Sequence, residues 1–266
     1  MTFIAVKLKQ DLKNKKVIKI ITGLSNFDTD NIIKTVHAAE MAGATYVDVS
    51  SNPKLVKILK SITTLPICVS SIAPRDLYNC LLSEADIFEI GNFDVFYYKD
   101  IYFSSYQIIQ LVKEVKSFLK NKPLCVTIPY FLPLHEQVIL VQKLQKIGVT
   151  MVQTEGYVNK NKCIFSRSPI LNSTVLASSA LSASHMISQY TNIPVIASSG
   201  INYISSPIAV ASGASGIGIG SALKYYNSIS EKAKYISQVI SSVNMYKKNK
   251  FFPYMQTYQI TNKCTN

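Results

Sequence analysis

The sequence predicts one α/β domain, a TIM-like (β/α)8 barrel with a short helix before its first strand. The chain has 266 residues, 48% of them hydrophobic, and barrels of this type use about 250 residues in one domain. Short apolar runs alternate with stretches of helical periodicity, which predicts parallel strands joined by helices. Eight such units follow one another without a linker, and no GxGxxG motif follows the first. This favours a closed barrel over an open dinucleotide-binding sheet.

In the first half of the chain, a helix at about residues 3–14 precedes four strand–helix units. The first strand is an apolar run that only Lys19 interrupts, and the helix after it ends at Gly43. Pro53 and Pro74 open the helices after the second and third strands, where a proline fits the first turn. The strands of this half are expected at residues 17–23, 46–51, 66–71 and 87–94.

The second half repeats the pattern, with a short extra helix at residues 205–211 between its last two strands. Glycine ends the helix at residues 134–147, and a polar loop at residues 157–174 follows the sixth strand. The other helices are expected at residues 106–119, 175–190 and 224–246. The strands are expected at residues 124–129, 151–156, 194–197 and 216–221. The barrel core then spans about residues 15–246, and the polar tail at residues 247–266 is expected to fray.

Loops of small residues end the seventh and eighth strands. Ser199, Gly200 and Ile201 follow the seventh strand, and Gly220 and Ser221 follow the eighth. Backbone N–H groups in such loops can reach phosphate oxygens, and TIM barrels often bind phosphate at this place. The alternative is that the glycines at 216, 218 and 220 only relieve crowding inside the barrel. The repeated Ser/Gly chemistry at both strand ends favours phosphate-binding loops.

Composition limits the partners. The formal net charge is +13, but only Arg75 and Arg167 are arginines, and lysines spread over helix faces do not predict nucleic-acid binding. The charge does favour anionic metabolites. Five scattered cysteines without a CxxC motif predict neither a disulfide scaffold nor a cysteine zinc site. No apolar run approaches the roughly 20 residues that span a bilayer, so no membrane partner is expected. A homo-oligomer stays open.

Four ionisable residues interrupt the apolar strands and are the candidate catalytic residues. They are Lys19, Asp48, Glu89 and Glu155. A carboxyl group close to another has a raised pKa and can transfer protons near neutral pH, while Lys19 can stabilise negative charge or form an imine. The alternative is a structural ion-pair network. Neutral polar residues expected to face the same space, as substrate-binding groups, are Ser70, Asn92, Thr127 and Gln153. The three histidines fall on helices, so no histidine metal site is expected.

Several segments together resemble a known family. They include residues 19–28, 66–70, 89–94, 126–129, 153–156 and 213–222. The sequence resembles the plastid-encoded family called hypothetical chloroplast reading frame twenty-three, which has cyanobacterial relatives. The resemblance implies a TIM-like barrel and a location in the plastid stroma, or in the cytoplasm of a cyanobacterium, and it assigns no reaction. The loops after the last two strands are also similar to those of phosphate-binding barrels such as thiazole synthase.

Three functions follow from these observations. The leading one is an enzyme that acts on a small phosphorylated metabolite by acid–base chemistry, as an isomerase, lyase or synthase. The second is an oxidoreductase that binds flavin mononucleotide (FMN) at the same phosphate loops, which makes FMN the one cofactor that the sequence suggests. The third is a barrel without catalysis, which senses a phosphorylated ligand or assists an assembly.

Overall fold

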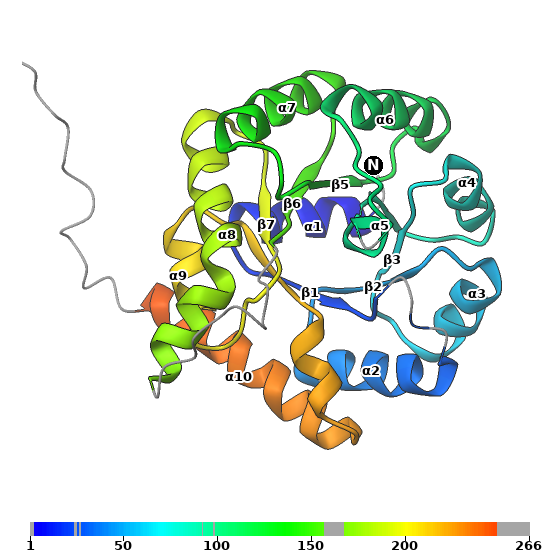
Figure 1. Cartoon of the computed structure of the whole chain (residues 1–266). Coiled ribbons are helices and arrows are strands. Elements are labelled where there is room, and N and C mark those ends of the chain that lie inside the picture. Colours follow the sequence, from blue (N-terminus) through cyan, green and yellow to red (C-terminus); the bar gives the residue numbers. More distant parts are fainter. Residues whose placement is uncertain are drawn as a thin grey trace, which may run out of the picture.

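Eight parallel strands close into a barrel in which each strand pairs with its neighbours in sequence and β1 also pairs with β8 (Figure 1). This confirms the predicted fold class. The computed structural model describes residues 3–23, 26, 28–91, 93–97, 99–156 and 168–248. The strands are β1 (Val17–Ile21), β2 (Tyr46–Ser50), β3 (Ile67–Ser70), β4 (Ile87–Ile90), β5 (Leu124–Ile128), β6 (Met151–Thr154), β7 (Val195–Ala197) and β8 (Gly216–Ile219).

Helices surround the barrel, and capping residues fix several of their ends. Asp28 caps α2 by accepting a hydrogen bond from the N–H of Asn31, and Gly43 ends that helix with a left-handed φ of 79°. The helices are α1 (Phe3–Lys13), α2 (Thr29–Ala42), α3 (Pro53–Ile62), α4 (Pro74–Leu82), α5 (Asp94–Tyr97), α6 (Ser105–Leu119), α7 (Leu134–Ile147), α8 (Pro169–Tyr190), α9 (Ser206–Ala211) and α10 (Ile229–Lys248), with the 3-10 helix η1 at Ser221–Tyr225. No helix among the described residues is both long enough and apolar enough to cross a bilayer.

Three predicted boundaries are wrong. β4 ends at Ile90 rather than at residue 94, because the chain turns at Gly91 and residues 94–97 form α5. α8 begins at Pro169 rather than near residue 175, because Ser168 caps it with a hydrogen bond from the N–H of Leu171. Residues 221–225 form η1 instead of the start of the last helix, which begins at Ile229. The polar tail from residue 249 lies outside the described residues.

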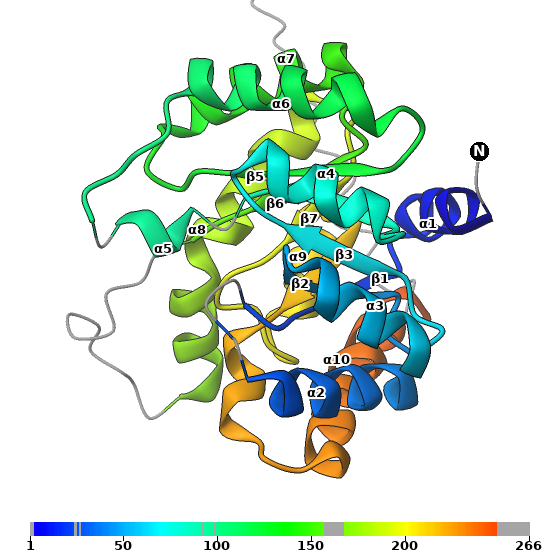
Figure 2. The same cartoon turned by 90° about the vertical axis from the view of Figure 1, so that its right-hand side faces the viewer.

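The interior of the barrel has an apolar layer at its amino-terminal end. Leu8 and Leu12 of α1 pack against it and close that end, and Figure 2 shows α1 at one end of the barrel and α5 at the other. Because side chains alternate along a strand, the next interior residue lies two positions further on. The apolar layer comprises Val17, Tyr46, Cys68, Ile87, Cys125, Met151 and Ile196. Two positions further on lies a second layer, the polar layer, whose residues are all at most 6% exposed. It comprises Lys19, Asp48, Ser70, Glu89, Thr127, Gln153 and Ser198.

The glycines of β8 make room for this interior. A Cβ at Gly216 would lie 2.6 Å from Cβ of Val17, and a Cβ at Gly218 would lie 2.9 Å from Oγ of Ser198. A Cβ at Gly220 would meet only Ile21, at 3.4 Å or more. Crowding therefore accounts for glycine at 216 and 218, as the alternative interpretation of the sequence proposed, but it does not account for Gly220.

Candidate functional site

Lys19 occupies the centre of the polar layer. Its Nζ lies 2.5 Å from Oε2 of Glu89, 2.9 Å from Oδ2 of Asp48 and 2.7 Å from Oε1 of Gln153. These side chains come from β1, β4, β2 and β6, and all of them are at most 3% exposed. The barrel thus brings together three of the four predicted catalytic residues, with one cation between two carboxylates.

Neutral side chains donate hydrogen bonds to one oxygen of each carboxylate. Thr127 and Gln153 donate to Oε1 of Glu89, at 2.9 and 3.0 Å, and Ser70 donates to Oδ1 of Asp48 at 2.5 Å. A buried charge is tolerated when it is paired and hydrogen-bonded. Glu89 meets both conditions, whereas Oδ2 of Asp48 pairs with Lys19 but accepts no hydrogen bond among the described residues. Three residues that the sequence predicts as substrate-binding groups therefore contact the predicted catalytic residues. The fourth, Asn92, lies outside the described residues.

Burial and charge shift the pKa values in this layer. Burial by itself would lower the pKa of Lys19, but Asp48 and Glu89 together raise it well above its ordinary value, so Lys19 stays an ammonium at neutral pH. Burial raises the pKa of Asp48, Lys19 opposes that shift and Glu89 adds to it. Asp48 is therefore the carboxyl group of this cluster that takes up a proton more readily than an ordinary aspartate.

Glu155 lies nearer the barrel mouth, directly after β6 and two positions beyond Gln153. It is 6% exposed, and its Oε2 accepts a hydrogen bond of 2.5 Å from the hydroxyl of Tyr97 in α5. The N–H of Tyr130 contacts the same oxygen at 3.4 Å. Tyr97 stacks on Tyr102, with ring centroids 5.4 Å apart. Glu155 is thus held at the carboxyl-terminal end of the barrel, where TIM barrels carry out catalysis.

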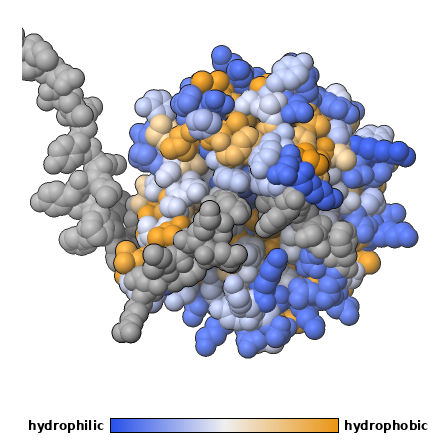
Figure 3. Space-filling model, in the orientation of Figure 1, coloured by the Kyte–Doolittle hydropathy of each residue, from blue (hydrophilic) through white to orange (hydrophobic). Residues whose placement is uncertain are grey.

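The surface around this mouth mixes polar and apolar residues. Figure 3 shows hydrophilic residues along much of the outer rim and apolar residues gathered in its upper half. Beside Glu155, the ring of Phe131 lies 5.7 Å from that of Tyr97 and 5.2 Å from that of Tyr102. The rings thus pack together around Tyr97, whose hydroxyl donates to the buried carboxylate of Glu155.

The two predicted phosphate loops differ in structure. After β7, Ser199 and Gly200 have left-handed φ values of 75° and 71°, and a Cβ at Gly200 would lie 1.9 Å from the carbonyl oxygen of Leu176. Ile201 is 4% exposed. After β8, Gly220 lines a cavity of about 320 Å³ between the first and eighth strands. Ser221 begins η1 and is exposed. The phosphate-binding role of both loops stays a prediction.

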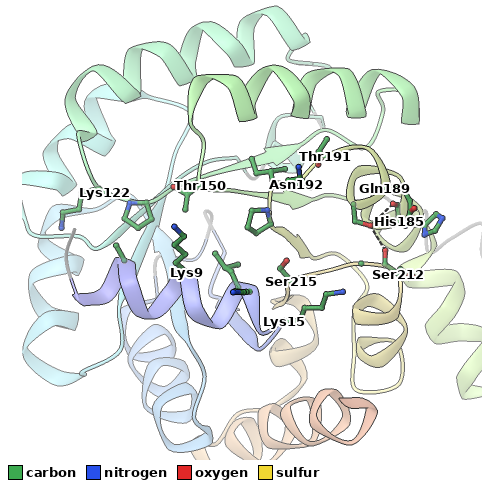
Figure 4. A pocket seen from close by; sticks show the side chains of 18 of the residues that line it. Lys9, Lys15, Lys122, Thr150, His185, Gln189, Thr191, Asn192, Ser212 and Ser215 are labelled. Carbon is green, nitrogen blue, oxygen red and sulfur yellow. Dashed lines mark hydrogen bonds between the residues drawn. The ribbon is translucent and has the colours of Figure 1, made fainter. Parts of the chain in front are cut away.

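A larger cavity lies at the opposite end of the barrel. It has a volume of about 1310 Å³, and Pro123, Thr150, Pro194 and Ser215, each directly before a strand, line it. In Figure 4, Lys9 extends from α1 toward Thr150. TIM-barrel enzymes place their active sites at the other end, so the size of this cavity does not make it part of the candidate site.

The residues of the candidate site that could bind a metal ion are Asp48, Cys68 and Glu89. Their ligand atoms lie within 4.8 Å of one another, and all three residues are buried. The ammonium of Lys19 already contacts both carboxylates, and burial raises the pKa of the Cys68 thiol well above its ordinary value. A metal ion would lie against this ammonium and require a thiolate that the site disfavours. The described donors therefore do not fit a metal while Lys19 keeps its charge.

The hydrogen bond between Tyr97 and Glu155 is a part of the site that the sequence does not reveal. The two residues are 58 positions apart, and a tyrosine in an aromatic segment predicts ring stacking rather than a bond to a particular carboxylate. Tyr46 is a second such residue, because its hydroxyl is buried beneath Lys19 without a hydrogen-bond partner among the described residues. Only its alternation with Asp48 along β2 indicates that it faces inward.

The two carboxylates beside Lys19 are expected to differ in their contribution to stability. Glu89→Gln places an amide N–H against Lys19, or against Thr127 and Gln153, and should lower the free energy of unfolding by about 2–4 kcal/mol at pH 7. Asp48→Asn also leaves Lys19 with one counter-ion, but burial raises the pKa of Asp48 and its Oδ2 accepts no hydrogen bond among the described residues, so the loss should be at most about 1 kcal/mol. Urea unfolding of both variants measures this difference, and equal losses would contradict it.

The pH dependence of Asp48→Asn provides a second test. A carboxyl group whose pKa is raised by folding stabilises the protein below its unfolded pKa, and this contribution is lost as the pH rises through the folded pKa. The wild type should therefore lose the contribution of Asp48 as the pH rises above about 4 and passes through the raised folded pKa, and the variant has none to lose. The cost of Asp48→Asn should be smaller at pH 7 than at pH 4 in paired unfolding curves.

Solved structures share this fold at low sequence identity. Thiamine phosphate pyrophosphorylase from Pyrococcus furiosus matches with a TM-score of 0.58 and 17% identity, over 88% of this chain and 98% of that one. (S)-3-O-geranylgeranylglyceryl phosphate synthase from Thermoplasma acidophilum, solved with its substrate sn-glycerol-1-phosphate, matches with a TM-score of 0.61 and 14% identity, over 92% of this chain and all of that one. At these identities the likeness establishes the barrel alone.

Relatives in sequence are much closer. "Uncharacterized protein ycf23" of Antithamnion sp. is 46% identical over 244 residues, which are 90% of this chain and 88% of that protein. The protein of the same name from Cyanophora paradoxa is 38% identical over 239 residues, 90% of this chain and 97% of that protein. This confirms the resemblance found in the sequence. Residues 4–249 match the family "Protein of unknown function (DUF561)", and the chain belongs to that family.

Proposed function

We propose that the protein is an enzyme that converts a small phosphorylated metabolite by acid–base chemistry at the carboxyl-terminal mouth of the barrel. The observation that carries this proposal is the polar layer in which Lys19 lies between Asp48 and Glu89, directly below Glu155. Interiors of TIM barrels are mostly filled with branched apolar side chains. Buried ionisable groups with shifted pKa values cluster at functional sites, which favours a functional role for this layer.

In this proposal Glu155 is the residue that exchanges a proton with the substrate. It follows the end of a strand, and the hydroxyl of Tyr97 orients its carboxylate. Lys19, Asp48 and Glu89 form the layer beneath it and supply a fixed positive charge and a carboxyl group of raised pKa. A substrate oxygen that becomes negative above this layer would be stabilised by the ammonium of Lys19. The reaction class is an isomerisation, a lyase reaction or a related synthase reaction.

The contacts of Lys19 favour this electrostatic role over imine formation. An amine must lose its proton before it can attack a carbonyl carbon. The Nζ of Lys19 has three close oxygen partners, and its neighbours raise its pKa. Reduction with borohydride in the presence of a carbonyl substrate should therefore leave no adduct on Lys19, which mass spectrometry of the purified protein can establish.

The structures that share the fold support the proposed substrate class. Several of these proteins are named after a phosphorylated compound, among them thiamine phosphate pyrophosphorylase and 3-hexulose-6-phosphate synthase. The positive net charge of the chain adds a favourable field for such anions. The relatives and the family resemblance support a location in the plastid stroma.

The proposal is tested first by ligand binding and then by turnover. Thermal unfolding with sugar phosphates, inorganic phosphate and FMN should show stabilisation by a phosphorylated ligand, about 2.7 kcal/mol at a hundredfold its dissociation constant. Gly220→Asp should abolish this effect, and Gly220→Ala should keep it, because a Cβ fits at this position. With the substrate so found, Glu155→Gln should lower turnover by about 10²–10⁴-fold and leave binding intact.

A barrel that binds its ligand without catalysis is the second candidate function. The complete burial of Lys19 and Glu89 favours it, because a buried ion pair can be purely structural. In that case ligand binding would survive both Glu155→Gln and Lys19→Met, and the wild type would release no product from any bound ligand. Product formation by the wild type and its loss in Glu155→Gln would exclude this function.

A further inference from the structure

Lys232 is a buried cation without a counter-ion. It lies on α10, is 2% exposed, and its Nζ donates one hydrogen bond of 3.0 Å, to Oγ1 of Thr35. Thr35 donates its own hydroxyl proton to the carbonyl oxygen of Asn31 at 2.8 Å. Among the described residues no carboxylate lies within 4.0 Å of Lys232. Two of its three N–H groups thus have no acceptor in the described part of the protein.

Such an arrangement is costly unless something else supplies negative charge. Removal of one partner from a buried ion pair is strongly destabilising, because the remaining charge has lost both water and counter-ion. Burial lowers the pKa of Lys232, and Lys34 lowers it further. By contrast, the other fully buried lysine among the described residues, Lys19, has two carboxylates in contact.

Lys232 lines the cavity of about 320 Å³ at the carboxyl-terminal rim of the barrel. The cavity lies where α10 packs against α2, two helices that run side by side in Figure 1. Gly23 and Asn31 form one wall, after β1 and at the start of α2, and Gly220 and Lys224 form the other, after β8. Its volume is at the lower end of the range for small-molecule sites, which is about 300–1000 Å³.

The charges around the cavity favour an anion. Its charged lining residues are Lys224, Lys232 and Asp28. Asp28 is exposed, and its Oδ1 already accepts the N–H of Asn31 as the cap of α2. The remaining balance is positive, and the first turn of α2 adds the favourable end of a helix dipole. Gly220, whose lack of a side chain crowding does not explain, leaves the wall open beside Lys232.

We propose that this cavity between β1 and β8 is a phosphate-binding subsite, in which the ammonium of Lys232 is the counter-ion of a phosphate group. The group can be free phosphate or the phosphate of a metabolite. The inference deepens the proposed function, on which it rests for the substrate class. It places the phosphate one strand further around the rim than the loop after β7, and it gives the phosphate a charged partner that the predicted loops lack.

The test measures phosphate binding to full-length variants by calorimetry, with potassium chloride at equal ionic strength as the reference. Lys232→Met keeps most of the side-chain volume and removes the charge. It should bind inorganic phosphate and glycerol 1-phosphate at least tenfold more weakly, which is the effect of losing one charged hydrogen bond. Lys234→Met is the matched control, because it removes the same charge from an exposed position of the same helix, and it should bind like the wild type.

Each outcome decides the proposal. Tighter binding of the ester than of inorganic phosphate would identify a metabolite as the source of the group, and the reverse would identify free phosphate. Equal binding by the wild type and Lys232→Met, or no binding of either probe by the wild type, would overturn the subsite. If the wild type and Lys232→Met bind phosphate equally, the proposed function is not affected, because its own tests use other phosphorylated ligands and Glu155→Gln.

Stability without phosphate gives a second readout. If Lys232 serves an anion, Lys232→Met should melt at the same temperature as the wild type or higher, since a buried charge without a partner is removed. A merely structural lysine would lower the melting temperature when lost. Should Lys232→Met fail to fold, Lys224→Glu reverses an exposed charge at the same cavity and should weaken binding of both probes at least tenfold.

Discussion

Lys19→Met should lower the free energy of unfolding by about 3–5 kcal/mol at pH 7, because it leaves two buried carboxylates without their cation. The substitution removes contacts of 2.5 Å to Glu89 and 2.9 Å to Asp48 in a layer that is almost inaccessible to water. The remaining carboxylates then repel one another. Urea or guanidinium unfolding followed by circular dichroism measures the loss.

The pH dependence gives this prediction a second, independent readout. Lys19 opposes the rise of the Asp48 pKa, so its loss must raise that pKa further. A carboxyl group with a raised folded pKa contributes stability below its unfolded pKa, and this contribution is lost as the pH rises. Lys19→Met should therefore regain stability toward pH 4. In the wild type, Lys19 has a raised pKa, so its own contribution to stability is complete below about pH 10 and is lost above it. The loss caused by Lys19→Met should thus be smaller at pH 4 than at pH 7.

A surface lysine provides the control for this substitution. Lys60 forms an ion pair of 2.7 Å with Asp86, but it is 31% exposed. Lys60→Met should therefore cost at most about 1 kcal/mol. Lys19→Met/Asp48→Asn should recover part of the loss, because one of the two unpaired charges is gone. Equal stability of Lys19→Met and wild type at pH 7 would show that the central cluster is not an ion pair.

The barrel could be predicted from the sequence because its signals are local. Branched apolar runs, helical spacing and glycine or proline at helix ends each report on neighbouring residues. Eight such units without a GxGxxG loop after the first favour a closed barrel over an open sheet. The inward direction of Lys19 and Asp48 also followed from alternation along a strand. Their contact with Glu89 and Gln153 did not follow in detail, because it depends on the register between β1, β2, β4 and β6.

The burial of Lys232 could not be predicted from the sequence. It falls on the apolar stripe of the last helix, at helical spacing from Ile236, Val239 and Val243. A lysine at such a position can extend its ammonium to water, and nothing in the sequence excludes that. Only the packing of α10 against α2 encloses the side chain beside Thr35. The cavity next to it is formed by segments about 200 residues apart along the chain.

Gly200→Ala is expected to be the most damaging glycine substitution in the two predicted phosphate loops, with a loss of about 2–5 kcal/mol in unfolding free energy. A left-handed φ of 71° costs an alanine about 1–2 kcal/mol. Its Cβ would also lie 1.9 Å from the backbone oxygen of Leu176 in α8, and overpacking of a fixed backbone adds about 1–3 kcal/mol. Denaturant unfolding of the purified variant measures the sum.

Gly220→Ala is the matched control for Gly200→Ala, and the difference in stability between the two variants indicates which loop has room for phosphate. Gly220 has a φ of −132°, and its nearest contact for a Cβ is 3.4 Å, so the variant should unfold within about 1 kcal/mol of the wild type. If Gly200→Ala were equally stable, the loop after β7 would be more open than its contact with α8 implies.

Packing explains the glycine at 200, so its presence is no evidence for a ligand. Packing leaves Gly220 unexplained, and Gly220 lies on the wall of the cavity that Lys232 lines. Of the two loops, the one after β8 is therefore where a bound phosphate should be sought.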